Sequence, residues 1–133
     1  MIEVKEIEKL LSKDDFVVCN VKGDSMRPFL KEDDKVVIVK KNRDIKMYDV
    51  VLYKRNNKYM LHRVIGINRD FLIIRGDNNI YKEEVKNEDI LGILAGYYNK
   101  NEYIEINDYI NRKYYKKSKN TLFLRKIIKK ITK

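Results

Sequence analysis

Between residues 16 and 106 the chain is a succession of short runs rich in β-branched and aromatic residues, separated by closely spaced turn residues. Such runs predict β-strands, and strands joined by short turns pair in antiparallel fashion. Asn56 and Asn57 form a typical hairpin turn between two of these runs. We therefore expect a mainly β fold, an antiparallel barrel or sandwich. The predicted strands cover residues 16–21, 36–39, 50–53, 59–67, 71–75, 90–98 and 103–106.

The two ends of the chain carry helical patterns. In residues 1–11 the apolar positions 4, 7, 10 and 11 fall on one face of a short helix. In residues 121–131 apolar and basic residues occupy opposite arcs, which predicts a basic amphipathic helix. The apolar arc consists of Phe123, Leu124, Ile127, Ile128 and Ile131.

The excess of positive charge belongs to the C-terminal segment. Residues 112–133 contain ten lysines and arginines and no acidic residue, whereas residues 1–111 contain 20 residues of each sign. The formal net charge of +10 therefore lies in this tail, and such an asymmetry predicts an anionic partner for it. We expect a β domain over residues 1–111, which includes the N-terminal helix, followed by the helical tail over residues 112–133.

Other features restrict the location and the cofactors. The first residues contain no apolar run long enough for a signal peptide or a membrane span, so we expect a cytoplasmic protein, peripheral to a membrane where the tail reaches one. Cys19 is the only cysteine and cannot form an intramolecular disulfide, and within a predicted strand it is expected to be a small buried hydrophobe. A single histidine and a single cysteine do not make a zinc cluster, and the chain has no glycine-rich phosphate loop. We therefore expect no metal and no cofactor.

Three segments contain the residue types of a serine hydrolase. Ser25 lies in the turn-forming segment 23–28, the only histidine is His62, and Asp77 follows in a Gly-Asp-Asn-Asn segment at 76–79. Serine is a weak nucleophile until a neighbouring base accepts its proton, and an acid orients that base. A histidine with an ordinary pKa of ~6.5 is largely neutral at pH 7 and can serve as the base. The alternatives are a surface turn, a packed strand histidine and a turn-capping aspartate.

These segments resemble the sequence boxes of one superfamily of serine peptidases. Residues 23–30 are similar to the serine box of type I signal peptidases, and residues 21–24 are similar to the self-cleaving repressors related to LexA. Residues 61–65 resemble the His-Arg box of the archaeal and endoplasmic-reticulum signal peptidases, which use histidine where the bacterial enzymes and the repressors use lysine. Residues 76–79 resemble the later Gly-Asp-Asn box. The similarity covers about residues 16–106.

The resemblance implies the signal-peptidase type of β fold and a serine endopeptidase activity, with Ser25 as nucleophile and His62 as general base. The acid that orients the histidine is expected to be Asp77. Histidine-type relatives also carry an aspartate a few residues after the Asn-Asn pair, where this chain has Glu83 and Glu84, so either glutamate is an alternative. Substrate-binding and oxyanion positions are expected beside the nucleophile, at Gly23, Asp24, Met26 and Pro28.

The chain also departs from the family patterns. Bacterial signal peptidases often carry a serine two residues before the nucleophile, where this chain has Gly23, so the oxyanion would rest on backbone donors, chiefly the N–H of Ser25. Phe29 replaces the usual threonine. The sequence shows neither the membrane anchor of signal peptidases nor the helix-turn-helix domain of the repressors. We expect an endopeptidase that cleaves an extended peptide or precursor. The alternatives are an inactive peptide- or leader-binding module and a DNA-associated regulator.

The tail has three interpretations. On an anionic membrane, residues 121–133 would bury their apolar arc and direct their lysines to the headgroups. Nucleic-acid binding would require only the basic charge. A helix packed on the barrel would bury the apolar arc and leave its basic side in solvent. The breadth of the apolar arc favours the membrane or the packed helix over nucleic acid.

Overall fold

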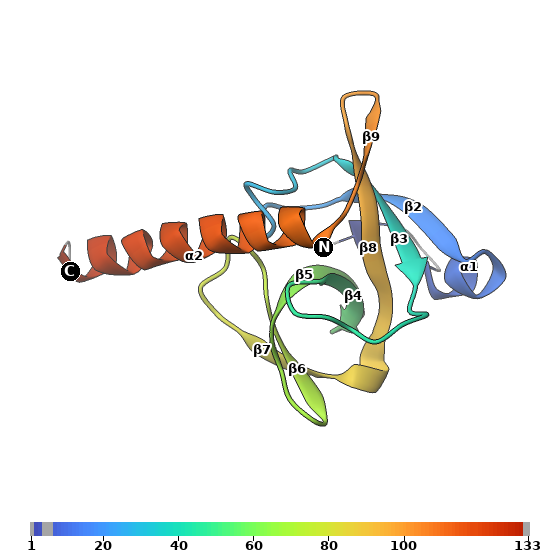
Figure 1. Ribbon diagram of the computed structural model, residues 1–133, viewed down its shortest axis with the longest axis horizontal. Coiled ribbons are helices and arrows are strands. Elements are labelled where there is room, and N and C mark those ends of the chain that lie inside the picture. Colours follow the sequence, from blue (N-terminus) through green and yellow to red (C-terminus); the bar gives the residue numbers. More distant parts are fainter. Residues whose placement is uncertain (1, 4–6, 132–133) are drawn as a thin grey trace.

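The computed structural model describes residues 2–3 and 7–131, with side chains from 7 to 128. Its elements are β1 (Ile2–Glu3), α1 (Ile7–Lys13), β2 (Phe16–Val21), β3 (Lys35–Lys40), β4 (Val50–Arg55), β5 (Lys58–Ile67), β6 (Phe71–Arg75), β7 (Glu83–Lys86), the 3-10 turn η1 (Asn87–Asp89), β8 (Ile90–Asn99), β9 (Glu102–Glu105) and α2 (Asp108–Ile131). Figure 1 shows the strands wrapped around one another and α2 extending away from them.

The described strands form one antiparallel sheet that closes on itself. Its order is β1-β2-β3-β8-β4-β5-β6-β7, with β9 paired to β8. A further pairing, between Ile2 of β1 and Tyr59 of β5, joins the two ends of the series from β1 to β5. The expected mainly β, antiparallel barrel is therefore confirmed. Strands β6 and β7 continue from β5 and fold over the outside of the barrel wall.

All the strands predicted from the sequence are present, with ends that agree to within two residues. Strand β7 was not predicted, because Val85 is its only buried residue and three charged residues surround it. The N-terminal helix begins later than expected, at Ile7, and a short strand precedes it. Ile7 and Leu11 are buried as the apolar pattern predicts, whereas Leu10 is exposed and position 4 lies outside the described residues.

Two apolar cores lie on the two sides of the wall formed by β4 and β5. Successive residues of a strand point to opposite faces, so Leu61 and Arg63 face one core while His62 and Val64 face the other. The inner core fills the barrel and includes Cys19. Burial raises the pKa of Cys19 to about 12, so its side chain stays a thiol. The outer core lies under β6 and β7 and contains Ile45, Val51, Tyr53, Val64, Leu72, Ile74, Val85, Ile90 and Ile93.

Helix α2 begins on the barrel and ends beyond it. The side chain of Asn107 accepts a hydrogen bond from the backbone N–H of Ile110 at 2.8 Å and so caps the first turn. Asn111, Ser118 and Leu122 are buried against the body. Past Leu122 the apolar side chains are exposed, so the interpretation in which the apolar arc packs on the barrel is wrong for the described residues. Within those residues neither helix combines the length and the apolar character that crossing a membrane requires.

Candidate active site

The turn that carries Ser25 follows the end of β2 and is held in place by a distant segment. Gly23 has a φ of 79°, a conformation that favours glycine. The backbone N–H of Asn78 donates to the carbonyl of Ser25 at 2.8 Å, and its side chain donates to the carbonyl of Asp24 at 3.0 Å. A Cβ on Gly76 would lie 2.7 Å from the Ser25 carbonyl oxygen, so this close approach requires glycine. The Gly-Asp-Asn segment therefore fixes the serine turn.

The structure brings Ser25 and His62 together. The Nε2 atom of His62, on β5, lies 3.1 Å from the Oγ of Ser25. The imidazole is buried, and this burial lowers the pKa of His62 to about 4. At neutral pH the ring is therefore uncharged, the form that can accept a proton from the serine.

A tyrosine and a glutamate lie on the other side of the imidazole. The hydroxyl of Tyr53 lies 2.9 Å from Nδ1 of His62, and it donates a hydrogen bond to Oε1 of Glu83. The same carboxylate oxygen is 4.0 Å from Nδ1 of His62. Arg55 pairs with the second oxygen of Glu83 at 3.2 Å, while partial burial raises the pKa of this carboxyl.

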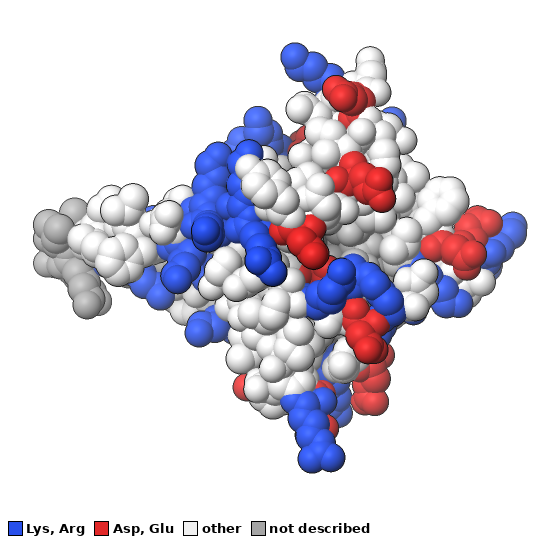
Figure 2. Space-filling view, viewed as in Figure 1, with Lys and Arg blue, Asp and Glu red and all other residues white. Residues whose placement is uncertain are grey.

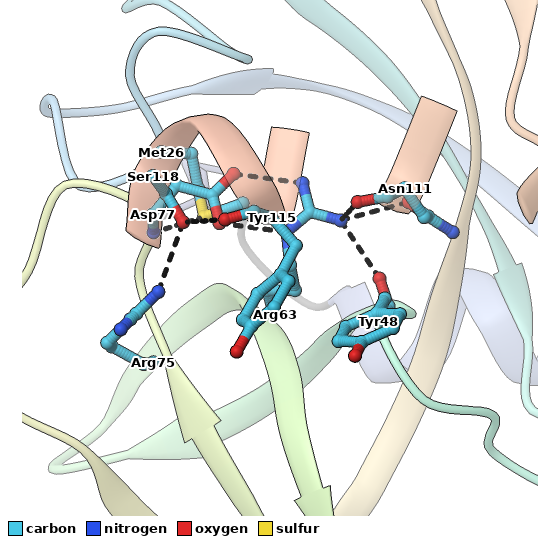
Figure 3. A network of polar contacts seen from close by, with 8 residues as sticks. All are labelled: Met26, Tyr48, Arg63, Arg75, Asp77, Asn111, Tyr115 and Ser118. Atoms are coloured by element: carbon cyan, nitrogen blue, oxygen red, sulfur yellow. Dashed lines mark hydrogen bonds and ion pairs between the residues drawn. The ribbon is translucent and has the colours of Figure 1, made fainter. Parts of the chain in front are cut away.

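Asp77 is not placed against His62. Both of its carboxylate oxygens accept hydrogen bonds from the guanidinium of Arg63, at 2.8 and 2.9 Å. Arg63 also donates to the carbonyl of Tyr48 and to the side chain of Asn111 (Figure 3). The expectation that Asp77 orients His62 therefore needs correction: its carboxylate is occupied by a buried arginine, on the opposite face of β5.

Glu84 does not reach the histidine either. It is exposed and neighbours Glu83 on β7, so its side chain points to the opposite face of that strand. Of the three acidic residues considered from the sequence, only Glu83 lies near the imidazole.

The residues that flank Ser25 divide into two groups. Gly23, Asp24 and Pro28 are exposed. Met26 is only 1% exposed, and its Sδ accepts the backbone N–H of Asp77 at 3.4 Å. Its expected role in substrate binding is therefore replaced by a role in the core. In the described part of the chain the backbone N–H of Ser25 makes no hydrogen bond, which leaves it available to an oxyanion.

Sequence reasoning missed Tyr53 and the role of Arg63. Tyr53 lies in a run of apolar residues on β4, where an aromatic side chain is expected to pack in the core rather than to make hydrogen bonds. Arg63 carried a detectable signal, because its position next to His62 on a strand predicts that it points away from the imidazole. A buried arginine on that opposite face requires a carboxylate partner, and Asp77 was available.

One comparison with known proteins gives a match. The model of the family described as Peptidase S24-like matches residues 3–96, well over half of the chain. No curated protein shows significant similarity. The matched range contains Ser25, His62 and Glu83, and it ends before helix α2.

Proposed function

We propose, from the premise that this chain belongs to the S24-like peptidase family, that it is a serine endopeptidase of the histidine type. The observation that carries the proposal is the 3.1 Å contact between Ser25 Oγ and Nε2 of a buried histidine. Two further observations support it: burial lowers the pKa of His62, and a carboxylate oxygen of Glu83 lies 4.0 Å from its Nδ1. In this proposal Ser25 is the nucleophile, His62 the general base and Glu83 the acid that orients the base, the three roles of a serine-hydrolase triad.

The proposed reaction has two halves. Ser25 Oγ attacks the carbonyl carbon of the scissile peptide bond while its proton moves to Nε2 of His62. The N–H of Ser25 stabilises the resulting oxyanion, and the C–N bond then breaks as Nε2 returns the proton to the leaving amine. Water attacks the acyl-enzyme ester, giving its proton to His62, and the carboxylic acid leaves as Ser25 regains its hydrogen.

The proposed substrate is an extended segment of a peptide or precursor protein. Beside Gly23, no atom lies within 4 Å of the position that a Cβ would take, so this side of the turn is open. An extended segment entering there could pair with a sheet edge, which supplies backbone hydrogen bonds with little dependence on sequence.

Replacing the nucleophile tests this function. The full-length protein is incubated with a library of unstructured peptides, and new termini are identified by mass spectrometry. Ser25→Ala should abolish cleavage and leave the fold intact, because the side chain lies on a turn. Ser12→Ala, at an exposed helix position, is the matched control and should cleave normally. Undiminished cleavage by Ser25→Ala would remove the serine from the mechanism, and peptide binding without cleavage by the unmodified protein would favour the binding module.

The surface of α2 supports a peripheral location on an anionic membrane. The face in view in Figure 2 is blue over the first part of this helix and white over its far part. In the first half of the helix, a hollow is lined by Arg112, Lys113, Lys116 and Lys119 together with Tyr109. Farther along, Phe123 and Leu124 are 63% and 58% exposed.

The helix directs these apolar residues away from the body. Arg112, Lys116, Phe123 and Ile127 follow at helical spacing and share one side. Arg125 points the other way and donates to the side chain and carbonyl of Asn78. Exposed apolar side chains beside lysines match the apolar and anionic layers of a lipid surface, whereas nucleic acid would require only the charge.

A further inference from the structure

We infer that Tyr53 is a positioning residue of this site: its hydroxyl joins His62 to Glu83 and selects the tautomer of the imidazole that can accept the serine proton. This inference rests on the proposed function, and it deepens it by naming a residue that acts through His62.

The donors and acceptors at the tyrosine hydroxyl allow one arrangement. An ionised carboxylate only accepts hydrogen bonds, so Tyr53 gives its single proton to Glu83. The oxygen of Tyr53 is then an acceptor toward Nδ1 of His62, 2.9 Å away, and Nδ1 must carry the hydrogen. A neutral imidazole has one N–H, so Nε2 is left with its lone pair directed at Ser25, 3.1 Å away.

The sheet register explains why Tyr53 reaches the histidine. Val51 on β4 lies opposite His62 on β5, and Tyr53 lies opposite Met60. Tyr53 and His62 are therefore diagonal neighbours on the same face, a separation that a long aromatic side chain can span. Tyr53 is fully buried in the outer core, so its ring has little freedom to leave this position.

The glutamate completes the arrangement from β7. Glu83 lies opposite Ile74 of β6, at the edge of the outer core, and it is partly exposed. Its other oxygen is held by Arg55 at 3.2 Å. When His62 takes the serine proton, the negative charge of Glu83 acts on the imidazolium through the polarised hydroxyl of Tyr53. The competing arrangement is a direct ion pair between Glu83 and His62, because Oε1 of Glu83 lies 4.0 Å from Nδ1.

The tautomer can be measured without any substrate. His62 is the only histidine in the chain, so the imidazole ¹⁵N signals of the full-length protein have a single origin. At pH 7 we expect a protonated Nδ1 and an unprotonated Nε2. In Tyr53→Phe the ring loses its acceptor, and we expect a mixture of tautomers or a shift of the proton to Nε2.

Kinetics supply the second measurement. Tyr53→Phe should lower kcat by at least about 10-fold, and by no more than the ~10²–10⁴-fold that general-base catalysis contributes in total, with little change in KM. Because tyrosine and glutamate act in series, the double variant Tyr53→Phe/Glu83→Gln should be no slower than the slower single variant. Tyr98→Phe, which removes a hydroxyl outside the site, is the matched control. Thermal unfolding of each variant separates a loss of catalysis from a loss of fold.

Two results would overturn the inference. One is an Nε2–H tautomer in the unmodified protein. The other is a Tyr53→Phe variant whose tautomer and kcat are both unchanged, together with a Glu83→Gln variant whose kcat is lowered. Glu83 would then act on His62 directly, without Tyr53. The spectrum does not depend on turnover, so an absence of any peptidase activity, which would contradict the proposed function, is distinguishable from a failure at Tyr53.

Discussion

At the scale of single residues, the buried imidazole of His62 decides the pH range of the proposed reaction. The ring is enclosed by Ser25, Tyr53 and the nearby carboxylate of Glu83. Removing it from water disfavours the charged form, and burial lowers its pKa to about 4. An ordinary histidine, with a pKa of ~6.5, would already be half protonated in mildly acidic solution.

The pH profile of kcat/KM should reflect this shift. Neutral His62 is the active form, so activity should be complete at pH 7 and be lost only as the pH falls through about 4. The measurement is a peptide-cleavage profile, with circular dichroism at each pH to show that the protein stays folded. A midpoint at the ordinary value of ~6.5 would mean that Glu83 offsets burial, and a rise only above ~8.5 would point to a lysine base.

At the scale of elements, helix α2 divides at Leu122. Up to this residue it is part of the body, since Asn111, Ser118 and Leu122 are buried. Beyond it, the described apolar side chains are exposed, and Arg125 donates a hydrogen bond to Asn78, in the segment that holds the serine turn. The described part of the helix beyond Leu122 therefore presents its apolar side chains to solvent.

Removing residues 123–133 should abolish binding to anionic phospholipid vesicles and leave the fold intact, because Asn111, Ser118 and Leu122 still pack against the body. The segment combines apolar burial with lysines and arginines that each contribute ~1 kcal/mol near an anionic surface, a contribution that salt weakens. Vesicle sedimentation at low and high salt measures the binding.

A matched variant separates burial from charge. Phe123→Ser/Ile127→Ser keeps every basic residue and should also lose most of the vesicle binding. Binding unchanged in this variant would mean that charge alone acts. Steeply salt-dependent binding to DNA, with none to vesicles, would favour the nucleic-acid interpretation.

At the scale of the whole molecule, one buried polar cluster joins three parts of the chain. Arg63 comes from the barrel wall, Asp77 from the segment that holds the serine turn, and Asn111 from helix α2 (Figure 3). Phe29 follows the serine turn, and its ring centroid lies 5.2 Å from the guanidinium carbon of Arg63. The serine-turn region, the barrel and helix α2 are thus held together by contacts of the same arginine.

Asp77→Ala should lower the free energy of unfolding by about 3–5 kcal/mol, because it leaves the buried charge of Arg63 without its partner. Chemical denaturation measures this loss. Asp33→Asn, which breaks an exposed ion pair with Lys22 and tolerates the φ of 71° at this position, is the control and should cost no more than about 1 kcal/mol. A stable Asp77→Ala variant that loses only kcat would instead return Asp77 to the role of orienting acid.

The sequence alone determined seven of the nine described strands, the two helices and the pairing of a serine turn with His62. Alternating apolar residues, turn residues and helical spacing are local patterns in the sequence. They predict the elements correctly because the apolar residues of each pattern lie on the face that is buried in a core, as in β2 and β3. The resemblance to histidine-type peptidases named Ser25 and His62, and the structure places them in contact.

Only the tertiary structure decided which acid lies near the histidine and which way the tail faces. The sequence favoured Asp77 and offered Glu83 as an alternative. In the structure a buried arginine holds Asp77, and the register of β6 and β7 brings Glu83 to Tyr53. The exposed side of α2 likewise follows from the contacts of Leu122 and Arg125 with the body. Register and the pairing of buried charges join residues distant in sequence, so the folded chain alone determines them.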